Sequence, residues 1–195
     1  MDTRTKLRQA MRQKRRGLLS AQHSCASQTL AAIVKELPAF KNSKNIAAYM
    51  AFNFEIDPMG IMEAAWEQGK TVYLPRLHRQ KNYYLEFQLY KPDDPLIANH
   101  FGIPEPIANP ANIITPDQLD LILMPLLAFD EQGMRLGYGA AYYDNTFAFT
   151  REHPAKPYLM GIGFDFQKVE KLEPGEWDIL MHGVATDKKF YPTKR

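Results

Sequence analysis

The chain has almost no cysteine: Cys25 is the only one among its 195 residues. An internal disulfide is therefore excluded, and the sequence fits a reducing compartment. One thiol cannot build a zinc cluster, and the five histidines lack the spacing of metal ligands. There is also no Ser/His/Asp or Cys/His arrangement, so the sequence does not indicate catalysis through a protein nucleophile.

Long apolar runs are missing as well. No stretch approaches the ~18 apolar residues that a membrane span needs, and no apolar segment follows the basic N-terminus as it would in a secretory signal. The net charge is only +2, so bulk charge selects no partner. The sequence has no repeats or low-complexity tracts, so we expect one domain over residues 1–195. We also expect a monomeric, cytoplasmic protein that contacts neither membrane nor nucleic acid.

Helical patterns alternate with short apolar runs along the chain. This alternation predicts an α/β fold: a three-layer, Rossmann-like, mostly parallel sheet with helices on both faces. Ligands of such sheets bind beyond the carboxyl ends of the strands. We expect helices over residues 3–16, 20–37 (with Ser20 as N-cap), 57–69 (with Asp57 as cap and Pro58 as first helical residue) and 142–149. Strands are expected over 46–52, 71–74, 83–90, 121–124, 158–164 and near 184, with a long loop over 91–118.

The most informative segment is the loop 135–144, which follows the strand 121–124 and a turn. Its glycines, Gly137 and Gly139, permit positive φ and a close approach of the backbone to a ligand. Arg135 offers a planar fork for phosphate oxygens, and Asp144 offers a hard oxygen ligand for Mg²⁺. A Gly-X-Gly alone also fits a structural turn. Because Arg135 and Asp144 flank the glycines, we interpret the loop as a nucleotide phosphate site.

The first helix carries a stripe of arginines at helical spacing, Arg4, Arg8 and Arg12, with Arg15 on the same side. The stripe is either a phosphate-binding face or the solvated side of an amphipathic helix, and the pattern alone favours the solvated side. A nucleic-acid-binding protein is a further hypothesis. It has less support, because the basic stretch is short and no aromatic residues interleave it.

Two acidic residues are candidates for binding. Glu55 lies between aromatic residues just after the strand 46–52, where it could accept hydrogen bonds from the N–H groups of a polar heterocycle. It could equally be an ordinary loop acid. Asp178 could be a second carboxylate ligand of the cation at Asp144, although by itself it is more typical of a turn.

Taken together, these segments resemble the 5-formyltetrahydrofolate cyclo-ligase family, also called 5,10-methenyltetrahydrofolate synthetase, over nearly the whole chain. The order and spacing of the motifs carry the resemblance. They are Lys6-Leu7-Arg8, Glu55-Ile56-Asp57, Tyr73-Leu74-Pro75, Gly102-Ile103-Pro104-Glu105-Pro106, the loop from Ala128 to Asp144, Gly161-Ile162-Gly163, Gln167 and Glu176-Trp177-Asp178.

The resemblance implies an enzyme that uses ATP and Mg²⁺ to cyclise 5-formyltetrahydrofolate to 5,10-methenyltetrahydrofolate, with release of ADP and phosphate. Arg135 would be the catalytic residue. Mg²⁺ would be held by Asp144 and Asp178, and the folate by Met50, Glu55, Tyr138 and Tyr142. ATP would contact Arg4, Arg8, Arg135, Leu136, Gly137, Tyr138, Gly139, Ala140, Ala141, Tyr142 and Tyr143.

The chain departs from the family pattern at two of these positions. Arg4 stands where the family usually has lysine, so a planar fork replaces a point charge. Ala141 stands where the family usually has glycine. If this position needs positive φ, alanine brings strain of about 1 kcal/mol. A folate- or nucleotide-binding protein that has lost catalysis is therefore the alternative to the enzyme.

Overall fold

A computed structural model describes residues 2–153 and 156–194. Its centre is an eight-stranded sheet in the order β12-β11-β10-β7-β1-β2-β3-β6. The five strands from β11 to β2 pair in parallel, and the remaining pairs are antiparallel. The strands are β1 (Asn45–Ala47), β2 (Thr71–Leu77), β3 (Leu85–Tyr90), β6 (Ile113–Ile114), β7 (Leu121–Pro125), β10 (Tyr158–Gly163), β11 (Gly183–Thr186) and β12 (Phe190–Pro192). The predicted mostly parallel α/β sheet is confirmed.

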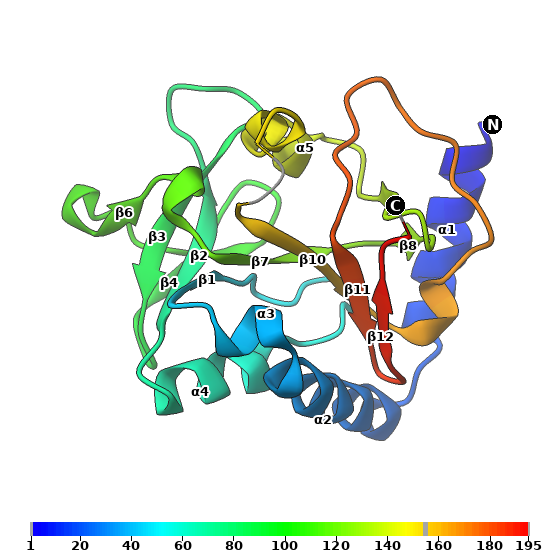
Figure 1. The fold of residues 1–195 in the computed structure, drawn as a ribbon, viewed down its shortest axis with the longest axis horizontal. Helices are drawn as coiled ribbons and strands as arrows, with labels where there is room; N and C mark the ends of the chain where they lie inside the picture. The colour runs from blue at the N-terminus through cyan, green and yellow to red at the C-terminus, as the bar shows by residue number, and fades with distance from the viewer. Residues whose placement is uncertain (1, 154–155, 195) are drawn as a thin grey trace.

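Helices cover both faces of the sheet, as predicted (Figure 1). One face carries α2 (Ser20–Glu36), α3 (Pro38–Lys41) and α4 (Met59–Glu67), whose buried residues, such as Leu30 and Ile61, pack against Ile46 and Leu74 of the sheet. The opposite face carries α5 (Tyr142–Thr146) and the 3₁₀ helix η3 (Ala148–Arg151). Two apolar clusters are thereby buried, one on each side of the sheet.

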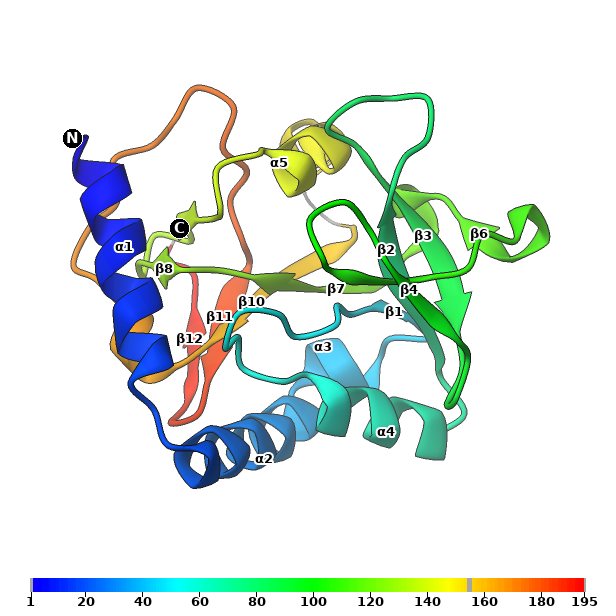
Figure 2. The ribbon, with the colours of Figure 1, turned by 180° about the vertical axis from the view of Figure 1, so that it is seen from behind.

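The first helix, α1 (Thr3–Arg16), does not lie on the sheet. It packs against the short hairpin of β8 (Ala128–Phe129) and β9 (Arg135–Leu136), and Figure 2 shows the helix and β8 side by side from the opposite direction. Met11 of α1 is buried there in a small apolar cluster with Leu127 and Leu136. This packing fixes α1 beside the predicted phosphate loop.

Several predicted boundaries were wrong. The strand expected over 46–52 ends at Ala47, and an irregular segment leads from it to a turn at Asn53 and Phe54, which both have positive φ. The second helix has Leu19 rather than Ser20 as its N-cap, with Gln22 accepting from the Leu19 N–H. The helix expected over 142–149 is divided into α5 and η3, and the helix expected from 57 begins at Met59, after Pro58 as N-cap and with Asp57 accepting from the Met59 N–H.

The region 91–118, predicted as a loop, contains a hairpin and an edge strand. The hairpin pairs β4 (Leu96–Ala98) with β5 (Pro104–Pro106), and β6 pairs with β3. Strands of two or three residues have no detectable periodicity, so their pairing depends on the rest of the fold. The other short elements are the 3₁₀ helices η1 (Pro110–Asn112), η2 (Pro116–Gln118) and η4 (Asp165–Gln167).

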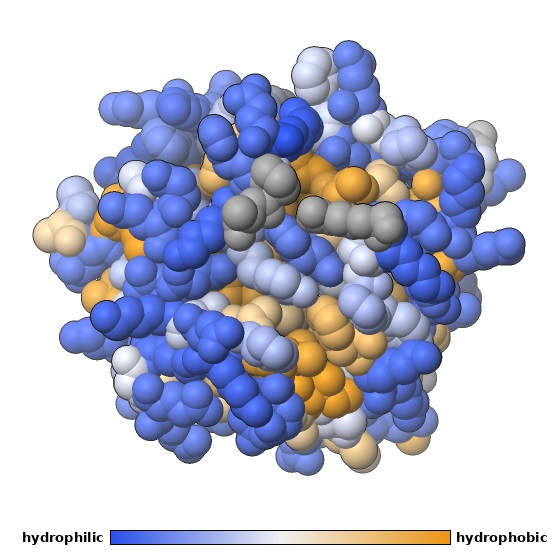
Figure 3. Space-filling view, in the orientation of Figure 1, coloured by the Kyte–Doolittle hydropathy of each residue, from blue (hydrophilic) through white to orange (hydrophobic). Residues whose placement is uncertain are grey.

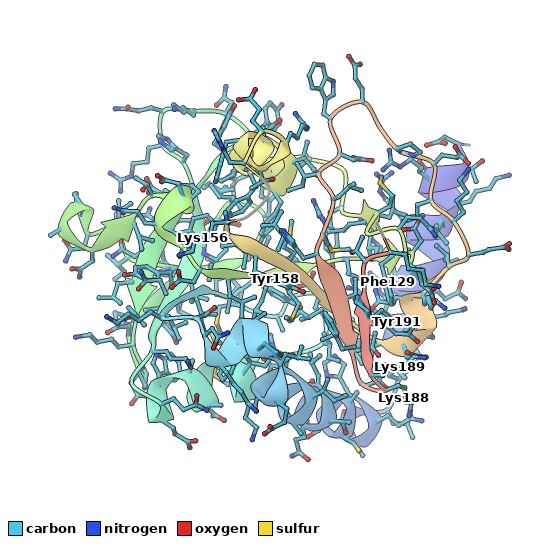
Figure 4. The ribbon with its side chains drawn as sticks, in the orientation of Figure 1. Phe129, Lys156, Tyr158, Lys188, Lys189 and Tyr191 are labelled. Atoms are coloured by element: carbon cyan, nitrogen blue, oxygen red, sulfur yellow. The ribbon has the colours of Figure 1, made fainter. Side chains whose placement is uncertain are left out.

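The strand β12 forms one edge of the sheet and was not predicted as a separate strand. Figure 4 shows Tyr191 on this strand, with Lys188 and Lys189 beside the turn that leads into it. The Tyr191 ring packs on Phe129 at 5.5 Å and lies 4.8 Å from the Lys189 ammonium. Burial, with the hydrogen bond to Asp165, raises the pKa of Tyr191 to about 12. Lysines at an edge strand oppose pairing with another chain.

The outer surface is largely polar on the face seen in Figure 3, where hydrophobic residues gather only in smaller areas among hydrophilic ones. Among the described residues, no helix has the length and apolar character that crossing a membrane would require.

The turn of the β8–β9 hairpin rests on Asp130 and Gly133. The buried Asp130 carboxylate accepts hydrogen bonds from the N–H groups of Gln132, Met134 and Leu172. Gly133 has φ +84°, and a Cβ there would lie 2.6 Å from the Met181 carbonyl oxygen. Both the conformation and the space therefore require glycine.

We expect Gly133→Ala to lower the free energy of unfolding by about 2–4 kcal/mol, since it adds a backbone clash to the cost of positive φ. Gly69→Ala is the matched control: Gly69 has φ +68° but open space around the added methyl, so only the conformational cost of about 1 kcal/mol remains. Urea unfolding of both variants measures the difference. Equal losses would show that the Met181 contact is unimportant.

The order of the parallel strands places the ligand site. β2 lies on one side of β1, whereas β7, β10 and β11 follow on the other, so the chain direction across the sheet reverses between β1 and β7. Sheets of this kind bind ligands at such a reversal, outside the carboxyl ends of the strands. Glu55 follows β1 and the loop 135–144 follows β7. The candidate heterocycle site and the candidate phosphate site therefore lie at the same edge of the sheet.

Candidate active site

A cavity of about 550 Å³ opens at the carboxyl ends of β1, β2 and β7, within the size range of small-molecule sites. It is lined by residues from α1, the segment after β1, the β4–β5 hairpin and the loop 135–144. Nearly every residue singled out from the sequence lies on its wall. These are Arg4, Arg8, Met50, Glu55, Arg135, Gly137, Tyr138, Gly139, Ala140, Ala141, Tyr142, Tyr143, Asp144 and Asp178.

Leu136 is the exception among the predicted site residues. Its side chain is fully buried in the cluster with Met11 and Leu127, away from the cavity. Its carbonyl accepts a hydrogen bond from the Leu127 N–H at 2.8 Å. The role that this geometry gives to Leu136 is to anchor the loop, not to contact a ligand through its side chain.

Two arginines of the α1 stripe, Arg4 and Arg8, line the cavity. Arg8 Nε donates to the Gly137 carbonyl at 2.9 Å, and Arg4 donates to Asp178 Oδ2 at 2.8 Å. Arg15 is only 1% exposed. The prediction that the arginine stripe is the solvated side of the helix was therefore wrong. The loop 135–144 and the Asp178 segment cover this side. Desolvation and the neighbouring Arg4 lower the pKa of Arg8, so the excess of positive charge here favours an anionic ligand.

Arg135 is buried and firmly held. Its Nη2 donates to Asp144 Oδ1 at 3.0 Å, and its guanidinium lies 5.6 Å from the centre of the Tyr143 ring. Its Nε is buried with no acceptor among the described residues. A buried donor without an acceptor costs stability that an oxygen-rich ligand at this site would recover.

The two predicted metal ligands, Asp144 and Asp178, each pair with an arginine through one oxygen. Asp178 Oδ2 also accepts from the Gly175 N–H at 2.7 Å. Within the described part of the chain, no three His, Cys, Asp or Glu side chains form a metal cluster. Two carboxylates on one cavity fit Mg²⁺, which usually takes one or two carboxylates and completes its coordination with phosphate and water oxygens.

The loop needs unusual backbone angles at two positions. Gly139 has φ +108°, and the Arg8 guanidinium lies 3.5 Å from where a Cβ would be. Ala141 has φ +54° and ψ +17°, the left-handed conformation, directly before α5. This position therefore has the positive φ that favours glycine, and alanine carries the strain.

We expect Ala141→Gly to change the free energy of unfolding by less than about 1 kcal/mol, because relief of the left-handed strain is partly offset by the greater freedom of glycine in the unfolded chain. Since the loop already has the glycine conformation, kcat should rise less than tenfold. Urea unfolding and steady-state kinetics test both expectations. A rise in kcat above tenfold with unchanged folding would show that Ala141 impairs the natural loop.

Glu55 is not an ordinary loop acid, because only 7% of it is exposed. Its Oε1 accepts from the Tyr138 hydroxyl at 2.5 Å and its Oε2 from the Phe52 N–H at 3.0 Å. Burial raises the pKa of Glu55, whereas these hydrogen bonds and the Arg15 charge oppose the rise. The result is a desolvated carboxylate on the cavity wall, suited to strong hydrogen bonds from N–H donors.

Sequence reasoning missed the roles of two residues. Arg15 was placed on the arginine face but not recognised as buried beside Glu55. Glu105 was quoted only as part of a motif, yet it is buried on the cavity wall, with Oε1 accepting from the Leu77 N–H at 2.9 Å and Asn99 Nδ2 at 2.7 Å. A glutamate between two prolines was the available signal for Glu105. Arg15 had no local signal beyond its helical spacing.

Comparisons with known proteins show the family of this chain. The sequence profile of the 5-formyltetrahydrofolate cyclo-ligase family matches residues 1–187. The 5-formyltetrahydrofolate cyclo-ligase of Haemophilus influenzae is 36% identical over 181 residues, which cover 93% of this chain and 96% of the relative. This chain belongs to the cyclo-ligase family.

Further cyclo-ligases support the assignment. The Escherichia coli K12 cyclo-ligase is 35% identical and covers 93% of this chain and 98% of its own. The NMR structure of Aquifex aeolicus 5,10-methenyltetrahydrofolate synthetase superposes with a TM-score of 0.82 at 27% identity, covering 100% of this chain and 94% of its own. The cyclo-ligase resemblance expected from the sequence motifs is confirmed.

Proposed function

We propose that this protein catalyses the ATP-dependent ring closure of 5-formyltetrahydrofolate to 5,10-methenyltetrahydrofolate, with ADP and phosphate as the other products. Its membership of the cyclo-ligase family supports the reaction. The observation that carries the proposal is the shared cavity: an arginine-rich glycine loop with two aspartates lies on the same cavity as a buried carboxylate.

The ATP phosphates bind between α1 and the loop 135–144. Arg4 and Arg8 approach from the helix and Arg135 from the loop, so three guanidinium groups lie on one cavity. The loop contributes main-chain N–H groups, as phosphate-binding glycine loops do. The residues that would hold Mg²⁺ are Asp144 and Asp178, and the cation, when bound, would neutralise charge on the phosphates.

The pterin ring binds at the Glu55 side of the cavity. The desolvated Glu55 carboxylate accepts hydrogen bonds from ring N–H groups. Met50 supplies an apolar contact, and Tyr138 and Tyr142 lie between the two substrates. This arrangement brings the formyl group toward the γ-phosphate.

The chemistry needs alignment and charge stabilisation more than a nucleophilic side chain. The formyl oxygen attacks the γ-phosphorus, and the bond from that phosphorus to the bridging oxygen of ADP breaks. N10 then attacks the activated formyl carbon, phosphate leaves with the former formyl oxygen, and N10 loses its proton. Arg135 stabilises the negative charge on the phosphoryl group during its transfer.

We propose that the protein acts as a monomer in the cytoplasm. Every residue assigned a ligand-binding role above lines the cavity of this one chain, which supports a monomer. The exposed free thiol of Cys25 suits a reducing compartment. The inward orientation of Arg8 and Arg15 argues against the nucleic-acid hypothesis, since these arginines are engaged within the chain.

The test is an assay of ADP release and methenyl-product absorbance, with and without 5-formyltetrahydrofolate. We expect ADP release to depend on the folate and to match product formation one to one. Tight folate binding without turnover would instead support the binding protein that has lost catalysis. Strongly salt-dependent retention of DNA or RNA would support the nucleic-acid hypothesis.

A further inference from the structure

Tyr138 reaches from the nucleotide loop to Glu55 and occupies its carboxylate. The Tyr138 hydroxyl donates to Glu55 Oε1 at 2.5 Å, and the Phe52 N–H donates to Oε2 at 3.0 Å. Both oxygens of this buried acid are therefore already hydrogen-bonded within the chain. A carboxylate oxygen can accept two hydrogen bonds, so an N–H group of an incoming heterocycle competes with the Tyr138 hydroxyl where it approaches Oε1 from the same side.

Arg15 completes this group from the end of α1. Its Nη2 donates to the Tyr138 hydroxyl oxygen at 2.6 Å, and its Nη1 lies 4.0 Å from Glu55 Oε1. The Arg15 side chain is 1% exposed, and Glu55 is the only acid within ion-pair distance of it in the described residues. A guanidinium buried this deeply needs a negative partner, so its position is tied to that of Glu55.

The Tyr138 side chain is partly open to the cavity. It is 36% exposed on the cavity wall and is flanked by Gly137 and by Gly139, which has φ +108°. Arg12 lies 5.4 Å from the ring centre and Arg15 5.6 Å, so these cations also act on the ring. Glycines on both sides let the backbone rotate without the steric penalty of a Cβ.

We propose that the Tyr138 hydroxyl is an internal ligand of Glu55 that an N–H group of the heterocyclic substrate displaces, and that Arg15 is a positioning residue that holds Glu55 during this exchange. The inference rests on the proposed function, because it takes the folate as the displacing ligand. Displaced Tyr138 remains part of the loop that binds ATP. Folate bound at the Glu55 side of the cavity therefore alters the conformation of the ATP-binding loop. The two substrates therefore influence each other's affinity reciprocally.

The first test is equilibrium binding of 5-formyltetrahydrofolate to the full chain at pH 8 without ATP, by calorimetry. Tyr138→Phe keeps the ring but removes the competing hydroxyl, so we expect Kd to fall about five- to tenfold. An unchanged or larger Kd in this variant would overturn the displacement. If the natural protein does not bind the folate at all, the proposed function itself fails, which is a different result.

The second test separates positioning from simple packing. Arg15→Met removes the cation that favours the ionised form of Glu55, so the pKa of Glu55 should rise further. N–H donors need the ionised carboxylate. As the pH is lowered, folate binding should therefore be lost at a higher pH in this variant than in the natural protein. The other ionisable groups facing Glu55 are the Tyr49, Tyr138 and Tyr143 hydroxyls, whose pKa values are all raised, so they stay neutral in this range.

Arg15→Lys should restore the original pH profile, because it keeps the charge. Arg16→Met, at the exposed neighbouring position, is the matched control and should bind the folate as the natural protein does. Far-UV circular dichroism checks that each variant folds. A folded Arg15→Met variant with an unshifted pH profile would overturn the positioning role of Arg15.

Discussion

Replacing Arg135 by lysine should lower kcat by about 10³-fold or more without unfolding the protein. Guanidinium groups that stabilise a phosphoryl group during transfer contribute about 10³–10⁵-fold in related chemistry. Arg135 is held by Asp144 and by the Tyr143 ring, so its fork is fixed before the substrates arrive. Lysine keeps the charge but cannot contact two phosphate oxygens in one plane. Steady-state kinetics at saturating ATP, with circular dichroism for the fold, measure the effect.

The control for this variant is Arg16→Lys, which makes the same exchange at an exposed position on α1. It should retain the natural kcat. If a folded Arg135→Lys variant keeps kcat within tenfold of the natural value, Arg135 does not stabilise the transferring group, and the proposed catalytic role is wrong.

Changing Asp144 to asparagine should have the second largest effect. The substitution removes one of the two carboxylates available to Mg²⁺, so we expect the half-saturating Mg²⁺ concentration to rise about tenfold and kcat to fall about 100-fold. It also removes the ion-pair partner of Arg135, which lies 3.0 Å away. A Mg²⁺ titration of ATP turnover measures both quantities. Excess Mg²⁺ should restore part of the activity of this variant. It should restore none of the activity of the Arg135→Lys variant.

Asp117→Asn is the matched control, because Asp117 is exposed in the short helix η2 and does not line the cavity. Its Mg²⁺ titration should coincide with that of the natural protein. The same coincidence for a folded Asp144→Asn variant would contradict a metal-binding role for Asp144.

The loop 135–144 could be singled out from the sequence as a candidate phosphate site because its chemistry is local. Arg135, the glycines and Asp144 lie within ten residues, and a strand and a turn precede them in the sequence. The parallel core was predictable for a similar reason, since its helices and apolar strands alternate along the chain. The strain at Ala141 also follows from one residue, once its left-handed φ is known.

The contacts that complete the site were not predictable, because they join distant parts of the chain. Arg8 bonds to Gly137, 129 residues away, and Tyr138 bonds to Glu55, 83 residues away. Helical spacing shows that the α1 arginines share a face, but it contains no information about which segment covers that face. The short strands β6 and β12 were missed for the same reason, since they are defined by their partners.

We propose that the triphosphate lies between α1 and the loop 135–144, with Arg135 at the phosphoryl group that moves. The most direct measurement is a crystal structure of the full chain with Mg²⁺ and a non-hydrolysable ATP analogue. We expect the γ-phosphate within hydrogen-bond distance of Arg135 and the cation on Asp144. A triphosphate bound away from residues 135–144, with this cavity left to other ligands, would contradict it.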